Sequence, residues 1–400
     1  MATTTTETQT STATQQNDLS QYDFANLESY EHPPETKADL PWSELVTLDL
    51  EDYNRPGGKE RLSKQLEHAV HHVGFVSTSP ECMQHNVLIQ AQFYVKNFGI
   101  SQEKVDRQFT LAKHFFKLPT SEKEKYEVDY ANADYNGWRR PGRSLVAQAR
   151  DNIEIYNFPK FTDDFRGKYA QPDLLQAHLP EIEEFQKALH SNVVLPLLRL
   201  FAIVLQLPDE DYLVKQHTYD RKSEDHSRYM IYHPRTEAEW AEAKYGATGG
   251  HTDLGTLTLL FRQPVAGLQI LGEDGNWTWV SAQPDTITVN LADTISHLTG
   301  GWLKSSVHRV VAPPEDQRQY SRTGLLYFAR PHNDTKLLPI IDSPVLEKAG
   351  VRPRFDKIVT VEEWVKAKQT LQLNPEETKK RWKEGKVEVL AGFHDQKYKE

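Results

Sequence analysis

Cysteine is nearly absent from this chain of 400 residues, since Cys82 is the only one. A single thiol cannot form an intrachain disulfide and cannot supply a thiolate metal cluster. Long apolar runs are also missing. The longest covers residues 193–207, contains Pro196 and Arg199, and is shorter than the about 20 residues that a membrane helix needs. We therefore exclude a disulfide scaffold, expect no membrane span, and expect residues 193–207 to form a buried core helix.

Positive charge is in short supply. The chain has 47 Lys and Arg against 57 Asp and Glu, a net charge of −10. Such a chain has no overall field that attracts polyanions, so we expect no nucleic-acid partner. The first 16 residues lack the apolar core of a signal peptide and the arginines of a transit peptide, and the first basic residue is Lys37. We expect a cytoplasmic protein.

The character of the sequence changes along the chain. Residues 1–40 have low hydrophobicity and no periodicity, and are expected to form a disordered tail. Residues 41–225 have mainly helical spacing, whereas residues 226–345 alternate short β-rich runs with Gly, Pro and Asp turns, which is typical of a β-sandwich or barrel. Residues 346–400 are expected to form a helical extension.

Apolar spacing predicts individual elements within these regions. Helices are expected over residues 59–73, where Gly74 would end the helix, from Ser101 onward, over 180–207 and over 361–371. Strands are expected over residues 46–50, 93–95, 151–158, 228–232, 256–261, 267–271, 277–280, 286–291, 305–311 and 324–328.

A His-x-Asp pair and a distant histidine form the sharpest chemical pattern. In an extended segment, residues i and i+2 point to the same face, so the His251 imidazole and the Asp253 carboxylate project together. His308 lies in a later β-rich run and can add a third ligand. Two histidines and one carboxylate on one side of a metal leave positions open, as in non-haem Fe(II) oxygenases. We predict a metal site at His251, Asp253 and His308.

Three alternatives stay open at this point. Zinc accepts the same ligand types, so the three residues alone do not name the metal. His297, in an expected turn between Asp293 and Thr299, is a rival to His308 as the third ligand. A polar turn with a capping aspartate would also produce the His-x-Asp pair without any metal.

Arg322 begins a β-rich run and is a candidate for holding a carboxylate. An inward-facing arginine can bind a carboxylate through two parallel N–H···O hydrogen bonds. Tyr232, at the end of an earlier β-rich run, can donate its phenolic hydrogen to the same carboxylate. A dicarboxylic co-substrate whose other end binds the metal needs such a clamp. The alternative for Arg322 is a surface salt bridge.

These residues lie in a stretch, residues 251–331, that resembles the iron/2-oxoglutarate-dependent oxygenases of the isopenicillin N synthase-like family. Weaker similarity extends the resemblance to about residues 42–345. It implies an α+β fold, a distorted double-stranded β-helix (jelly roll) core with flanking N-terminal helices. The segments that carry the resemblance are residues 251–260, 267–269, 279–280, 289–293, 298–300 and 304–310, with residues 93–100 and 115–126 in the N-terminal half.

The resemblance also implies the chemistry. His251, Asp253 and His308 would bind Fe2+, and Arg322 and Tyr232 would hold 2-oxoglutarate as the co-substrate. The protein would be a dioxygenase of secondary metabolism that hydroxylates or desaturates a small organic metabolite while O2 and 2-oxoglutarate are converted to succinate and CO2. The alternatives are an oxidase of the same fold that does not use 2-oxoglutarate, and a ligand-binding jelly roll without catalysis.

Three departures from the family pattern are visible. The family's Arg-x-Ser is Arg322-Thr323-Gly324 here, which removes a hydroxyl and predicts weaker binding of 2-oxoglutarate unless Arg318 or Arg330 compensates. Ala292 replaces the glycine of Asn-Leu-Gly-Asp, which is tolerable where φ is negative. Residues 76–92 separate two segments that the family joins directly, and are either a surface loop or a retained intron.

The substrate is expected at the open end of the barrel. Trp138 offers a flat apolar face, and Arg139 with its basic neighbours can meet an anionic group, although a solvated basic turn is the alternative for that segment. We expect a monomeric enzyme and a small, partly apolar substrate such as a terpenoid or polyketide. The candidates for contacting it are Trp138, Arg139, Tyr156, Phe158 and Phe328.

Overall fold

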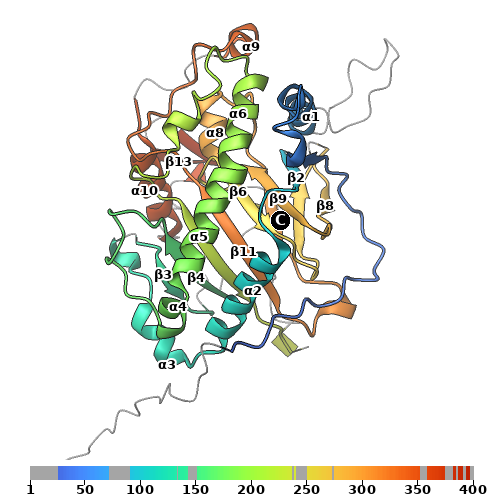
Figure 1. The fold of residues 1–400 in the computed structure, drawn as a ribbon, viewed down its shortest axis with the longest axis vertical. Helices are drawn as coiled ribbons and strands as arrows, with labels where there is room; N and C mark the ends of the chain where they lie inside the picture. The colour runs from blue at the N-terminus through green and yellow to red at the C-terminus, as the bar shows by residue number, and fades with distance from the viewer. Residues whose placement is uncertain are drawn as a thin grey trace, which may run out of the picture.

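The computed structural model shows a large sheet, a smaller sheet packed against it, and helices that cover the outer face of the large sheet (Figure 1). Gly74 and residues 76–90 of the segment 76–92 lie outside the residues that the structure describes. The structure describes residues 26–71, 91–132, 134–142, 151–236, 238–239, 250–272, 274–351, 358–373, 382–383, 386–390 and 393–396.

The large sheet contains eight strands, and all neighbours in it are antiparallel except the parallel pair β1 and β2. The expected strands are confirmed, with ends that shift by a few residues. In spatial order the strands are β1 (Thr47–Asp49), β2 (Gln92–Lys96), β9 (Thr286–Leu291), β6 (Leu257–Phe261), β11 (Arg322–Ala329), β5 (His226–Tyr232), β4 (Ile153–Pro159) and β3 (Gly137–Arg139).

The smaller sheet closes the barrel. It contains β10 (His308–Val310), β7 (Leu268–Leu271) and β8 (Trp277–Trp279). Leu268 and Ile270 of β7 pack against Tyr94 of the large sheet. The two facing sheets form the expected double-stranded β-helix.

Strand alternation divides the large sheet into an inner and an outer face. On β11, Leu326 packs against the same buried cluster as Val310 of the smaller sheet and therefore faces the barrel interior. Its neighbours Leu325 and Tyr327 belong to the main apolar core beneath the helices. Side chains at even positions of β11 thus point into the barrel, which positions the functional residues described below.

The helices that cover the outer face are α1 (Gly58–His71), α2 (Gln102–Lys117), α5 (Leu179–Leu189) and α6 (Leu195–Val204). The Ser101 side chain accepts a hydrogen bond from the backbone N–H of Lys104 and caps α2, as expected. Between α5 and α6 lies a π-helical turn, His190–Val194. It ends two residues before Pro196, which has no N–H to donate to the preceding turn.

The continuous helical stretch Leu179–Val204 is long and apolar enough to cross a membrane by length and composition, with a mean hydropathy of 1.4. Within the described residues it is the only such stretch. The protein buries 56% of the most apolar part of this stretch. Leu197, Leu198 and Phe201 lie in the main apolar core, as expected for residues 193–207. Figure 1 shows the stretch as one rod along the large sheet.

The expected disordered tail over residues 1–40 is wrong for residues 26–40, and residues 1–25 lie outside the described part. The Tyr30 ring stacks on Phe109 of α2 with ring centroids 5.2 Å apart, and the Tyr30 N–H donates to Thr110 Oγ1. Further along, the Lys37 N–H donates to Asp316. This segment has no periodicity because it follows the surface of other elements rather than forming its own.

The expected helical extension over residues 346–400 is only partly correct. The helix α10 (Val361–Leu373) confirms the prediction for residues 361–371. A three-stranded antiparallel sheet, which the sequence analysis missed, follows it: β12 (Trp382–Lys383), β13 (Lys386–Leu390) and β14 (Phe393–Gln396). Strands this short and this rich in charge carry little apolar alternation.

Candidate active site

His251, Asp253 and His308 lie together at one end of the barrel, as predicted. His251 and His308 face each other across an antiparallel bridge and exchange two backbone hydrogen bonds of 2.9 Å. The Nε2 atoms of His251 and His308 lie 3.9 Å and 3.8 Å from Oδ1 of Asp253. All three ligand atoms lie within 4.8 Å of one another. The rival His297 instead lies on α8 (Asp293–Leu298), with its ring edge against Trp364.

Hydrogen bonds orient these side chains toward a common point. Thr258 Oγ1 and Asn290 Nδ2 both donate to Oδ2 of Asp253, at 2.7 Å and 3.0 Å, which leaves Oδ1 facing the imidazoles. Nδ1 of His308 lies 3.2 Å from the carbonyl oxygen of Ser306. A carbonyl only accepts, so Nδ1 carries the proton and Nε2 presents a lone pair. The sequence analysis missed Thr258 and Asn290 as supporting residues.

The three side chains fit a divalent metal ion. Burial alone would raise the pKa of Asp253, but electrostatic interaction with the His308 and His251 imidazoles and the hydrogen bonds from Thr258 and Asn290 hold it below its ordinary range. The carboxylate is therefore ionised at neutral pH. Both Nε2–Oδ1 distances are shorter than two metal–ligand bonds of about 2.1 Å each. Imidazole nitrogen with carboxylate oxygen is a ligand set that suits Fe2+.

The helix α10 packs against the segment that bears His251 and Asp253 and stabilises it. Lys368 of α10 forms a buried ion pair with Asp293, and its Nζ lies 3.5 Å from Thr252 Oγ1. The Asp293 N–H in turn donates to the carbonyl oxygen of Asp253 at 2.8 Å. Leu254 packs on the apolar cluster that α10 builds. No local pattern links residues this far apart in the chain, so sequence reasoning had no signal for Lys368.

Arg322 and Tyr232 are also brought together, as predicted. They are register partners on β11 and β5, and the Arg322 guanidinium carbon lies 5.4 Å from the centre of the Tyr232 ring. Both side chains are buried. The Nε–H of Arg322 donates to the carbonyl oxygen of Val265 at 3.1 Å. A surface salt bridge, the alternative for Arg322, is therefore wrong.

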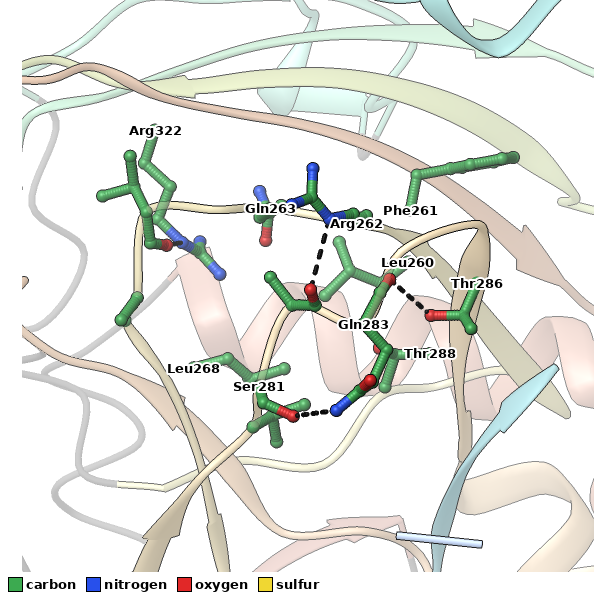
Figure 2. A pocket seen from close by; sticks show the side chains of 15 residues that line it. Leu260, Phe261, Arg262, Gln263, Leu268, Ser281, Gln283, Thr286, Thr288 and Arg322 are labelled. Carbon is green, nitrogen blue, oxygen red and sulfur yellow. Dashed lines mark hydrogen bonds between the residues drawn. The ribbon is translucent and has the colours of Figure 1, made fainter. Parts of the chain in front are cut away.

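Arg322 lines a cavity inside the barrel (Figure 2). None of the three predicted metal ligands lines this cavity. Two residues of its wall, however, lie on the same strands as the residues that hydrogen-bond to Asp253. Leu260 and Thr288 lie two positions from Thr258 and Asn290 on β6 and β9, so each pair shares a face of its strand. The cavity thus continues along the same inner face that holds Asp253.

Gln263 occupies the place left by the missing serine. A side chain on Gly324 would collide with the amide nitrogen of Gln263, which donates to the carbonyl oxygen of Thr323 at 3.1 Å. Gln263 lines the same cavity as Arg322. Neither Arg318 nor Arg330 lines it, and Arg330 lies eight residues from Arg322, roughly 26 Å along the strand direction. The lining of this cavity therefore gives no support to compensation by either arginine.

The expected substrate contacts are wrong for three residues. Trp138, Tyr156 and Phe158 are at most 1% exposed and belong to the main apolar core on the outer face of the sheet. The Trp138 indole donates to buried Glu154, and the Tyr156 ring packs on Phe115 of α2. Their strands were identified correctly, but alternation directs these side chains away from the barrel.

The other two candidates remain on the inner side. Phe328 stacks on His226 with ring centroids 4.6 Å apart, on the face of β11 that Arg322 also occupies. Arg139 is paired with Asp151 and donates to the carbonyl oxygen of Ile153. Ala292, the other departure, has φ −121, so its methyl group causes no backbone strain, as expected.

A jelly roll that places two imidazoles, one carboxylate and a buried arginine along its inner face defines the class of non-haem iron oxygenases. Family models agree. The 2OG-Fe(II) oxygenase superfamily matches residues 220–331, and the N-terminal region of non-haem dioxygenases in morphine synthesis matches residues 45–177.

Individual proteins show the same similarity. The chain is 32% identical over 278 residues to UPF0676 protein C1494.01 of Schizosaccharomyces pombe, covering 68% of this chain and 81% of that protein. It is 26% identical over 312 residues to the 2-oxoglutarate-dependent dioxygenase frbA of a Dothideomycetidae species, covering 70% and 88%. In fold it is similar to a full-length protein of Neurospora crassa, crystallised in complex with alpha-KG, at a TM-score of 0.68 and 20% identity, covering 84% and 100%.

The chain belongs to the 2OG-Fe(II) oxygenase superfamily. It is a 2-oxoglutarate-dependent dioxygenase, an oxidoreductase whose cofactor is Fe2+ and whose co-substrate is 2-oxoglutarate. The comparisons support this assignment over the 2-oxoglutarate-independent oxidase.

Proposed function

We propose that His251, Asp253 and His308 hold Fe2+, that Arg322 and Tyr232 hold 2-oxoglutarate, and that the enzyme hydroxylates or desaturates a small organic metabolite. When bound, the iron supplies the oxidising chemistry that couples the decarboxylation of 2-oxoglutarate to attack on a C–H bond of the substrate. The protein binds and orients the reactants.

The single observation that carries the proposal is the convergence of Asp253 Oδ1 with the two Nε2 atoms. Thr258 and Asn290 occupy the other carboxylate oxygen, and Ser306 fixes the tautomer of His308. Asp253 and His308 are thus held in their ligating states before any ion arrives. Such pre-orientation lowers the free-energy cost of binding.

The co-substrate role of Arg322 follows from its position. A buried guanidinium at the wall of a cavity binds a carboxylate strongly, because little water competes for it. Tyr232, its neighbour across the strands, has its pKa raised by burial, so the phenol keeps its proton and can donate it. Gln263 adds an amide group at the position of the missing serine hydroxyl.

The proposal is tested by anaerobic titration of Fe2+ into the protein in the presence of 2-oxoglutarate, following the metal-to-ligand charge-transfer band. The wild type should develop the band, and His308→Ala should not. His297→Ala removes a nearby histidine that lies outside the cluster, and should behave as the wild type. A band that survives in His308→Ala, or one that is lost only in His297→Ala, would contradict the ligand assignment.

The remaining proposals concern the setting of the enzyme. We expect a cytoplasmic monomer that binds neither nucleic acid nor membranes, because the chain is acidic and more than half of the most apolar part of its longest apolar helix is buried. A metabolite of secondary metabolism fits the fungal dioxygenases to which the chain is similar. Size-exclusion chromatography with light scattering checks the oligomeric state.

A further inference from the structure

Arg330 is a buried cation beside the metal-ligand segment. It follows β11 directly and is only 7% exposed. Its Cγ lies 3.2 Å from the point where a side chain on Gly255 would begin, so its stem passes over the backbone two residues after Asp253. In the described part of the chain, Nε of Arg330 has no hydrogen-bond partner. A buried guanidinium nitrogen without a partner is costly, and it calls for a partner from outside the chain, such as water, an ion or a ligand.

Arg228 supplies a second cation on the same inner surface. It lies on β5 opposite Leu326, and its guanidinium carbon is 4.6 Å from the centre of the Phe328 ring. Nε of Arg228 donates to the side-chain oxygen of Asn157 at 2.8 Å, which is a neutral partner. Among the described residues neither Arg228 nor Arg330 has a carboxylate oxygen within 4.0 Å.

The negative charges near these two arginines are already engaged. Asp225 accepts hydrogen bonds from Tyr327 at 2.9 Å and from Ser223 at 2.6 Å, and Glu224 accepts one from Asn333 at 3.3 Å. The Asp253 carboxylate also interacts electrostatically with both arginines. A metal ion bound at Asp253 would offset the charge of that carboxylate, whereas Glu224 and Asp225 keep theirs, and within the described chain neither of them contacts a guanidinium directly.

We propose that the substrate carries a carboxylate, and that Arg330 with Arg228 binds this group beside the metal site. The inference rests on the proposed function, and it names the substrate class. The apolar ring of Phe328, next to both His226 and Arg228, would contact the body of the substrate. A carboxylate matches the flat, forked donors of a guanidinium. The co-substrate does not compete for these arginines, because Arg322 lies at the other end of β11.

The test is calorimetric titration of the anaerobic protein loaded with Fe2+ and saturated with 2-oxoglutarate. The probes are benzoate, cinnamate and decanoate, each paired with its primary amide. At least one acid should bind about tenfold tighter than its amide, as expected for a charge-assisted hydrogen bond. Arg330→Met should abolish this preference and Arg330→Lys should keep part of it. Arg221→Met, which removes an exposed arginine paired with Asp334, should change nothing.

Two further readouts separate substrate binding from other roles. The thermal midpoint of Arg330→Met should not fall, because the variant removes a buried nitrogen that lacks a partner; a purely structural arginine would give a large fall. The affinity for 2-oxoglutarate should also be unchanged. Equal binding of acids and amides across the panel, or weaker binding of 2-oxoglutarate in Arg330→Met, overturns the proposal.

Titration of the metal-free protein distinguishes this inference from the proposed function. If the wild type binds neither Fe2+ nor 2-oxoglutarate but still prefers acids in an Arg330-dependent way, the anion site stands and the proposed function fails. If Fe2+ and 2-oxoglutarate bind as expected and the acids show no preference, only the anion site fails.

Discussion

The Thr256 hydroxyl donates a hydrogen bond of 2.7 Å to Nε2 of His217. Both residues are at most 1% exposed. The other ring nitrogen, Nδ1, donates to the carbonyl oxygen of Leu213 at 2.7 Å. Burial favours the neutral imidazole, in which both ring nitrogens have a hydrogen-bond partner. Because Thr256 lies three residues after Asp253, this histidine connects the helical region to the segment that bears the metal ligands.

Stability should therefore depend on pH through His217. Burial lowers its pKa to about 4, against 6.5 ordinarily, so between these values the unfolded chain binds a proton that the folded protein does not. The stabilisation that comes from neutral His217 is fully present above about pH 6.5. It is lost as the pH falls toward 4, which lowers the free energy of unfolding by roughly 3 kcal/mol.

Urea unfolding of the metal-free protein between pH 5 and 8 checks this dependence. His217→Asn keeps a donor for Leu213 and should be less stable at pH 8, but its deficit should shrink as the pH falls. His114→Asn alters a histidine near the surface and is the control. A deficit that is constant with pH would contradict the assignment of a neutral, buried His217.

Breaking the ion pair between Lys368 and Asp293 should destabilise the protein. Their side chains are 4% and 11% exposed, and Lys368→Met leaves the aspartate buried without its cation, which costs about 3–5 kcal/mol. Lys366→Met, on the same helix, removes an exposed pair with Glu362 and should cost little. Thermal unfolding compares the two variants. Equal losses would show that α10 does not brace the site through Lys368.

Weaker support of Asp253 should lower the affinity for iron without unfolding the protein. Asn290→Ala removes one of the two donors to Oδ2 and should weaken Fe2+ binding about 10- to 100-fold. Thr286→Val changes the same strand but removes only a bond to the carbonyl oxygen of Gln283, so it serves as the control. Anaerobic Fe2+ titration measures both. Unchanged affinity in Asn290→Ala would mean that Thr258 alone orients the carboxylate.

Gln263→Ala should raise the concentration of 2-oxoglutarate that half-saturates decarboxylation by up to about tenfold, the effect of one lost hydrogen bond. Gln283→Ala alters another amide at the wall of the same cavity and should leave the value unchanged. Succinate release against 2-oxoglutarate concentration provides the measurement. If both variants respond alike, the effect belongs to the cavity as a whole rather than to the amide beside Gly324.

Local sequence patterns determined the positions of most strands and the relative direction of the side chains at the site. The two-residue spacing of His251 and Asp253 determined that their side chains share a face, and the β-rich runs determined which segments form strands. Sequence also predicted the pairing of Arg322 with Tyr232 at one site. These inferences succeeded because spacing along a strand translates directly into side-chain direction.

Only the tertiary structure decided which face of a strand meets the barrel interior. Alternation places Tyr156 and Phe158 on one common side, but only packing against α2 shows that this side is the core rather than the substrate pocket. Likewise, Lys368, Gln263 and Arg330 gain their roles from neighbours that lie far away in sequence. Spacing along the chain determines relative side-chain direction, whereas the choice of partner depends on how distant strands and helices pack, which no local pattern records.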